Sequence, residues 1–201
     1  MRSFFTLLLL FILSTCGRAQ TPLLNVPLER SWEQSVHWEE LNELDGRFRL
    51  LTPAPLTHSI DTVATELGEQ VYHTFHLQAP YPDDAENIIY AISYVDYPAG
   101  SLHHDSLDLV SEFLATTEEE AAAALGGEII YATDVIQSNY PARQWRIDYP
   151  SKGRLATART LATVISRRYY EIKVFSLRSA GVSKAGDKFF DSLRLFPPDE
   201  Q

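Results

Sequence analysis

The chain has 201 residues, of which 45% are hydrophobic and 11% aromatic, a composition that is typical of a globular domain and excludes a disordered or fibrous chain. Its 27 acidic residues outnumber its 17 basic ones. The resulting formal charge of −10 at pH 7 excludes a general affinity for nucleic acid or anionic lipid, since both are repelled. The single cysteine, Cys16, excludes a framework of disulfides within the chain.

The chain begins with the pattern of a secretory signal peptide. Arg2 precedes an apolar run over residues 4–13, which is shorter than the roughly 20 residues that a transmembrane helix needs. Gly17 and Ala19 then offer a small-x-small cleavage site. We therefore expect residues 1–19 to be removed after Ala19 and the protein to be secreted or periplasmic, with no transmembrane span.

An alternative gives Cys16 a role of its own. The letters L-S-T-C resemble the lipobox of a bacterial lipoprotein, in which the cysteine becomes the lipidated first residue. Thr15 departs from that motif, which has Gly, Ala or Ser at this place, so we favour cleavage after Ala19. The mature chain then has no cysteine, and its stability comes from a packed core.

The segment that follows, residues 20–45, is polar and shows no strand alternation. Trp32 and Trp38 stand among glutamates in it. We expect an N-terminal lead-in with about one helical turn between Trp32 and Leu44. A single α+β domain should then occupy residues 46–198.

The first predicted strands are short. Residues 47–51 form one, which ends because Pro53 cannot donate to a sheet ladder. Residues 59–66 and 71–77 form a hairpin around Gly68, whose lack of a side chain suits a tight turn. In its second strand, His73 and His76 fall on opposite faces and cannot bind one ion together.

The middle of the chain changes from a strand to a helix. Residues 87–97 are apolar on both alternating faces, which predicts a central strand covered on both sides. After it, apolar residues recur at a helical period between Leu107 and Leu125. Gly126 and Gly127 should end that helix.

Strands return in the second half, and one more helix closes the chain. We predict strands over 128–137, 142–149, 155–165 and 169–177, and a helix over 183–196. Ser183 is the expected N-cap, and Phe189 and Leu193 form an i, i+4 stripe. Runs of strands separated by hairpin-length turns predict an α+β fold, an antiparallel β-sheet flanked by helices as an α/β/α sandwich.

Several stretches together resemble a known group of proteins. They are the hairpin D-T-V-A-T-E-L-G-E-Q-V-Y-H-T-F, the strand Y-A-I-S-Y-V-D-Y-P, the long helix, the hairpin ending R-R-Y-Y-E-I-K-V and the terminal F-F-D-S-L-R-L-F. Over residues 46–196 the chain resembles small extracytoplasmic bacterial proteins of PsbP/Mog1-like fold. The resemblance implies an antiparallel sheet flanked by helices, without an assigned activity.

Better-known proteins of that fold act as binding or assembly subunits. They include an accessory protein of the photosynthetic oxygen-evolving complex and a partner of a small nuclear GTPase. The resemblance rests on hydrophobic pattern and element order, so no functional residue is carried over to this chain.

The stretch S-L-H-H-D-S-L-D, just before the long helix, is the first candidate site. His103, His104 and Asp105 are ligand types that suit Zn²⁺ or a similar ion. The favoured alternative is local: Asp105 or Ser106 accepts hydrogen bonds from the first amides of the helix. Asp105 and Asp108 also favour the positive end of its dipole.

A basic and aromatic cluster on adjacent predicted strands is the second candidate. It could form a surface for an anionic ligand or a protein, or its arginines could simply pair with carboxylates across the sheet. Its members are Arg143, Trp145, Arg146 and Arg168, with Arg159 and Arg167 nearby.

No catalytic motif is specific enough to name a reaction. The sequence has no G-x-S-x-G elbow, P-loop or G-x-G-x-x-G. Asp83 and Asp84 suit a solvated loop, and residues 118–120, E-E-E, suit a solvated helix face.

We therefore expect a non-enzymatic domain without a cofactor that binds a protein partner in the cell envelope or serves as an accessory subunit. The alternative is a small-molecule or divalent-metal-binding module using His103 and His104. A hydrolase with a site assembled from dispersed residues is the third hypothesis.

Overall fold

The computed structural model describes residues 31–177 and 183–196; the predicted signal peptide and Cys16 lie outside this part. Seven strands form one antiparallel sheet in the order β3-β4-β5-β9-β8-β7-β6. Their bounds are β3 (Thr57–Thr65), β4 (Gly68–Gln78), β5 (Ile89–Asp96), β6 (Glu128–Gln137), β7 (Tyr140–Ser151), β8 (Arg154–Ile165) and β9 (Arg168–Ser176).

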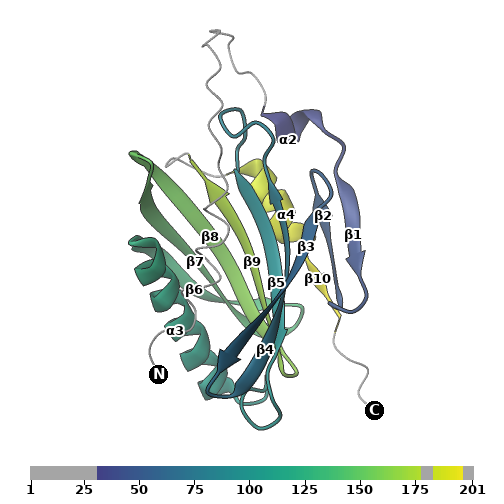
Figure 1. Ribbon diagram of the computed structural model, residues 1–201, viewed down its shortest axis with the longest axis vertical. Coiled ribbons are helices and arrows are strands. Elements are labelled where there is room, and N and C mark those ends of the chain that lie inside the picture. The colour runs from purple at the N-terminus through teal and green to yellow at the C-terminus, as the bar shows by residue number, and fades with distance from the viewer. Residues whose placement is uncertain (1–30, 178–182, 197–201) are drawn as a thin grey trace.

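A second, small sheet lies against one face of the first. It has the order β1-β2-β10, again antiparallel. In Figure 1 the seven-stranded sheet stands between the long helix on the left and this small sheet on the right. The strands of the small sheet are β1 (Glu39–Glu43), β2 (Phe48–Thr52) and β10 (Arg194–Leu195).

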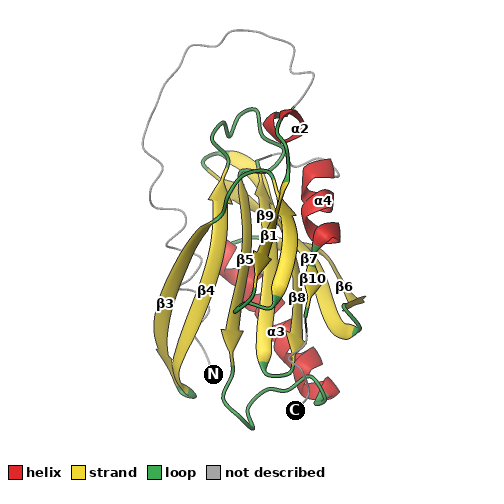
Figure 2. Ribbon diagram, turned by 90° about the vertical axis from the view of Figure 1, so that its right-hand side faces the viewer, coloured by secondary structure: helices red, strands yellow, loops and turns green. Residues whose placement is uncertain are grey.

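The described helices cover both faces of the seven-stranded sheet. The long helix α3 (Leu107–Leu125) lies against β6, β7 and β8, while α4 (Lys184–Ser192) packs against β2 on the other side. A short helix, α2 (Trp32–Ser35), precedes the small sheet. Figure 2 shows these layers with α3 behind the sheet and α4 in front of it. The predicted α+β class, an antiparallel sheet flanked by helices, is confirmed.

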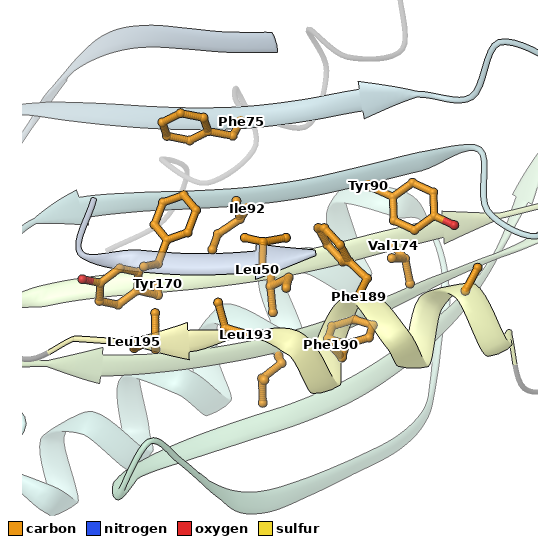
Figure 3. Packing of buried hydrophobic residues seen from close by; sticks show 14 of the residues in the cluster. Leu50, Phe75, Tyr90, Ile92, Tyr170, Val174, Phe189, Phe190, Leu193 and Leu195 are labelled. Carbon is orange, nitrogen blue, oxygen red and sulfur yellow. The ribbon is translucent and has the colours of Figure 1, made fainter. Parts of the chain in front are cut away.

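Two hydrophobic cores result, one on each face of the seven-stranded sheet. The core under α3 includes Val110, Leu114 and Trp145. The core on the other face joins α4 and the small sheet to β5 and β9 (Figure 3). In that figure the side chains of Leu50, Phe189 and Leu193 meet those of Ile92 and Val174 from the large sheet; other members are Trp38, Phe48, Tyr90 and Tyr170.

Most predicted elements are present. β5 is buried along nearly its whole length, as its apolar pattern predicts, and α3 spans the predicted residues and ends at Gly126 in the left-handed conformation. Gly68 has a φ of 98° at the β3–β4 turn. None of the helices in the described ranges is long and apolar enough to cross a membrane.

The predicted lead-in is partly a packed element. We expected a lead-in with one helical turn and no paired strand up to Leu44. Residues 39–43 instead form β1, which pairs with β2. Trp32 and Trp38 are buried in the core, and the indole N–H of Trp38 donates to the backbone oxygen of Glu33 at 3.0 Å. Part of the chain before Gly46 therefore packs with the rest.

The closing helix is shorter than predicted. Ser183 caps it as expected, accepting from the backbone N–H of Gly186 at 2.9 Å. The helix ends at Ser192, however, and Leu193 takes an extended conformation. Leu195 then pairs with Phe48 in the small sheet, which places both apolar side chains in the core. Backbone pairing with β2 replaces the last helical turn.

Candidate functional site

The histidine pair lies in the loop between β5 and α3. The Nδ1 atom of His103 is 3.3 Å from one carboxylate oxygen of Asp105, and the Nε2 atom of His104 is 3.1 Å from the other. One potential ligand atom from each of the three residues lies within 4.8 Å of the others. The loop therefore gathers the three residues that the sequence offers as candidate metal ligands, and metal binding by them stays a hypothesis.

His104 also attaches this loop to the β8–β9 turn. Its backbone N–H donates to the oxygen of Ser166 at 3.0 Å, and the N–H of Ser166 donates to Nδ1 of His104 at 3.1 Å. Because Nδ1 accepts a hydrogen bond, the neutral ring carries its proton on Nε2, where it can donate to Asp105. A metal ion at Nε2 requires the other tautomer, whose Nδ1–H no longer accepts the hydrogen bond from Ser166.

The capping role expected next to these histidines is absent. Ser106 occupies the N-cap position of α3, but its side chain makes no capping hydrogen bond. The carboxylate of Asp105 faces the two imidazoles instead. Asp108 does lie in the first turn, where its charge suits the helix dipole.

Two members of the predicted basic surface lie on the α3 side of the sheet. Trp145 is 0% exposed and belongs to the core, so it contributes nothing to a surface and corrects that part of the prediction. Arg143 donates from Nε to Glu118 at 2.5 Å and from Nη1 to Asp134 at 2.7 Å. Burial lowers the pKa of Arg143, but the bonds to these two carboxylates outweigh it and raise the pKa above its ordinary value.

Glu118 is itself a correction. We expected residues 118–120 to form a solvated face of α3, whereas Glu118 is buried and turned toward the sheet. Its ion pair with Arg143 accounts for this orientation, because a buried carboxylate requires a charged or hydrogen-bonding partner.

The other arginines of the predicted surface serve different contacts. Arg146 forms a bidentate ion pair with Asp148, in which Nε donates to Oδ1 at 2.9 Å and Nη2 donates to Oδ2 at 3.1 Å. On the α4 side, Arg159 donates to Asp187 at 2.8 Å. Arg168 is buried, and it binds both carboxylate oxygens of Asp96, at 2.7 and 2.6 Å. These residues stabilise the sheet and do not form one exposed surface.

A groove of about 390 Å³ runs between the first half of α3 and the β6–β7 hairpin. Its two rims are apolar and exposed: Leu107 on the helix is 60% exposed, and Ile136 on the strand is 71% exposed. The lining residues are Leu107, Asp108, Val110, Ser111, Leu114, Asp134, Val135, Ile136, Pro141 and Ala142.

The charge of the groove is negative. Asp108 and Asp134 both belong to its wall. Arg143 pairs with both Asp134 and Glu118, so the charges of these three residues sum to minus one. The carboxylate of Asp108 contributes one further negative charge. The groove therefore combines apolar rims with an excess of carboxylates.

The groove was not foreseen from the sequence. Leu107, Val110 and Leu114 follow a helical period, which predicts burial for all three, but Leu107, the first residue of α3, is largely exposed. The signal in the sequence is the adjacent pair Val135 and Ile136, which places an apolar side chain on each face of the predicted strand.

No protein-family model and no curated protein matches the chain. It is similar to the solution structure of a cyanobacterial PsbP, CyanoP, from Synechocystis sp. PCC 6803, with a TM-score of 0.52 and 10% identity over 92% of this chain and 99% of that one. At that identity the likeness shows the fold alone: the fold is PsbP-like.

Two further structures are more distant. A protein from Bacteroides thetaiotaomicron VPI-5482 has a TM-score of 0.49 and 14% identity over 80% of this chain, which spans about half, 49%, of that protein. A protein of unknown function from Pseudomonas aeruginosa has a TM-score of 0.37 and 15% identity over 70% of this chain and 83% of that one.

Proposed function

We propose that this protein is a non-enzymatic, secreted or periplasmic domain that binds a protein partner of the cell envelope, as an accessory subunit. The observation that carries the proposal is the groove between α3 and β6, with Leu107 and Ile136 exposed on its two rims. Covering a side chain of that size fully contributes about 1.5–3 kcal/mol. At their present exposure, each rim residue offers about 1–2 kcal/mol to a partner.

A protein partner suits this groove better than a small molecule does. Small-molecule sites enclose most of the ligand surface and present a few polar groups that converge on it. Here both rims are open to solvent, and the lining is largely apolar. A continuous chain that lies along the groove can cover both rims at once.

The polar side chains of the predicted sites support a non-enzymatic role. Arg143, Arg146 and Arg168 each bind carboxylates within the sheet. His104 is held between Ser166 and Asp105. These groups stabilise one another, whereas catalytic groups are typically held ready for a substrate.

Site-specific photo-crosslinking in the native host tests the proposal. A photoreactive residue replaces Leu107 at the groove. In a matched control it replaces Leu67, which is 51% exposed in the β3–β4 turn, at the opposite edge of the sheet from β6. We expect a discrete crosslinked protein from position 107 and none from position 67. Equal patterns at both positions, or no crosslink at 107, would contradict a partner at the groove.

The proposed location has a separate test. The predicted signal peptide is its support. Fractionation of the host, with N-terminal sequencing of the mature protein, should give a chain that begins after Ala19 outside the cytoplasm. A cytoplasmic full-length chain would overturn the location, and a lipidated Cys16 would support the lipoprotein alternative.

A second candidate function is divalent-metal or small-molecule binding at His103, His104 and Asp105. The 4.8 Å grouping of their ligand atoms favours it. Native mass spectrometry and thermal denaturation with Zn²⁺ test the metal: a real site gives a mass adduct and a stabilisation that His103→Ala abolishes. No mass adduct and no stabilisation with Zn²⁺ would remove this candidate.

A further inference from the structure

β6 is an edge strand of the seven-stranded sheet: among the residues that the structure describes, its only strand neighbour is β7. Its pairing with β7 is irregular between Ile129 and Tyr131 but regular over residues 131–137. Edge strands are commonly protected by lysine, proline or a bulge. The stretch 131–137, Y-A-T-D-V-I-Q, has none of these, and its one charge, Asp134, is paired with Arg143.

The groove lies directly beside this open edge. Ala132 is paired with Trp145 of the core under α3, and Asp134 with Arg143, which contacts Glu118 of that helix. Alternate residues of β6, including Ile136, therefore point to the α3 side. A strand added to β6 would lie about 4.8 Å beyond it and would turn every second side chain to the same side, along the groove.

The charges indicate what kind of strand fits. Asp108 and Asp134 line the groove, and the single guanidinium of Arg143 is shared between Asp134 and buried Glu118. Basic side chains among the apolar ones would neutralise this excess. A second copy of the same chain would bring its own Asp108 and Asp134 to the contact, so self-association is disfavoured.

From this geometry we propose that β6 takes up an extended segment of the partner as an additional strand. Apolar side chains of that segment lie against Leu107 and Ile136, and its basic side chains meet Asp108 and Asp134. Backbone hydrogen bonds to residues 131–137 supply affinity, and the groove supplies selectivity. This inference rests on the proposed function and names the chemistry of the partner segment.

The test uses random peptides of about 12 residues, displayed on phage and selected on the intact protein. We expect selected sequences that alternate apolar residues with lysine or arginine. Ile136→Asp should weaken binding of a selected synthetic peptide about tenfold or more, because it places a charge at an apolar contact. The matched control is Ile60→Asp on β3, the other edge strand, where the side chain is 57% exposed; it should leave binding unchanged.

Amide hydrogen exchange reads the backbone pairing directly. The bound peptide should protect amides of residues 131–137 that face away from β7, and N-methylation at alternate positions of the peptide should abolish binding. Binding without that protection, insensitivity to Ile136→Asp, selection of acidic or proline-rich sequences, or no selected sequence would each overturn strand addition. Dimerisation of the protein through β6 in solution would do so as well.

The two proposals fail separately. A partner that crosslinks at position 107 while no peptide protects β6 leaves protein binding in place and removes only the strand mode. Peptide binding at β6 with no crosslinked partner in the host would instead remove the proposed function.

Discussion

Replacing Arg168 by alanine should destabilise the fold. Its guanidinium binds both oxygens of Asp96 and the backbone oxygen of Asp45, and it lies 4.4 Å from the ring centre of Tyr94. A buried hydrogen bond to a charged group contributes about 1.5–3 kcal/mol, and a cation–π contact contributes about 0.5–1 kcal/mol. The sum is reduced because Asp96 is half-exposed and water can solvate its carboxylate once Arg168 is removed. We therefore expect a loss of about 2–4 kcal/mol in the free energy of unfolding.

Urea and thermal unfolding measure this loss, with Arg167→Ala as the matched control. The side chain of the neighbouring Arg167 is exposed and donates to the backbone oxygen of Tyr97 at 3.2 Å, so the same change of charge there should cost about 0.5 kcal/mol or less. The melting temperature should fall by roughly 4–16 °C for Arg168→Ala and by about 2 °C or less for the control. Equal effects of the two substitutions would refute the structural role of Arg168.

The pH dependence adds a second readout. Burial raises the pKa of Asp96, but hydrogen bonds and charge from Arg168 outweigh it, so the pKa lies below its ordinary value. A carboxyl with a lowered folded-state pKa stabilises the protein above its unfolded pKa of about 3.9, and that stabilisation is lost as pH falls further. The difference between wild type and Arg168→Ala should therefore be full at neutral pH and shrink below about pH 4.

Three further predictions concern stability. Burial, with the charges of His58 and Arg168, lowers the pKa of His73, so the unfolded chain binds more protons and stability should fall as pH drops below about 6.5. His73→Phe should flatten that part of the melting-temperature profile, and an unchanged slope would count against it. Trp38→Ala should cost about 3–5 kcal/mol in urea unfolding, because the indole is buried in the core; a cost below about 1 kcal/mol would mean that residues 31–45 do not pack. His104→Ala should speed hydrogen exchange at the amide of Ser166, its donor at 3.1 Å, while exchange at β5 amides stays unchanged; equal protection of Ser166 would contradict the role of His104.

Periodicity predicted most of the large sheet and α3. β5 is apolar on both faces, and α3 repeats its apolar residues every 3.6 positions, so their burial follows from local pattern. β1 could not be predicted in this way. Its sequence, E-E-L-N-E, has little strand propensity. It becomes a strand because it pairs with β2 and because the neighbouring Trp38 is buried in the core.

The candidate sites depended on contacts between residues distant in sequence. The grouping of His103, His104 and Asp105 follows from their adjacency and was predictable. Burial of Arg168 and Trp145 was not, because it depends on Asp96 and on α3, which lie far away along the chain. The sequence of a basic cluster on neighbouring strands does not reveal whether its arginines are exposed or paired with carboxylates from other elements.

The groove also arises from distant elements. Its walls come from α3 and from the β6–β7 hairpin, and no single stretch of sequence contains both. Only the arrangement of the described strands, in which β6 pairs with β7 and with no other, places the exposed Ile136 at the edge of the sheet beside α3.

Co-purification from the native host, quantified by mass spectrometry, tests the central claim most directly. Wild type, Ile136→Asp and Ile60→Asp are compared under the same conditions, since both substitutions place the same charge on an exposed isoleucine of an edge strand. We predict one specific envelope protein that is retained by wild type and Ile60→Asp and lost by Ile136→Asp. Equal retention by all three would show that the groove between α3 and β6 is not the binding surface.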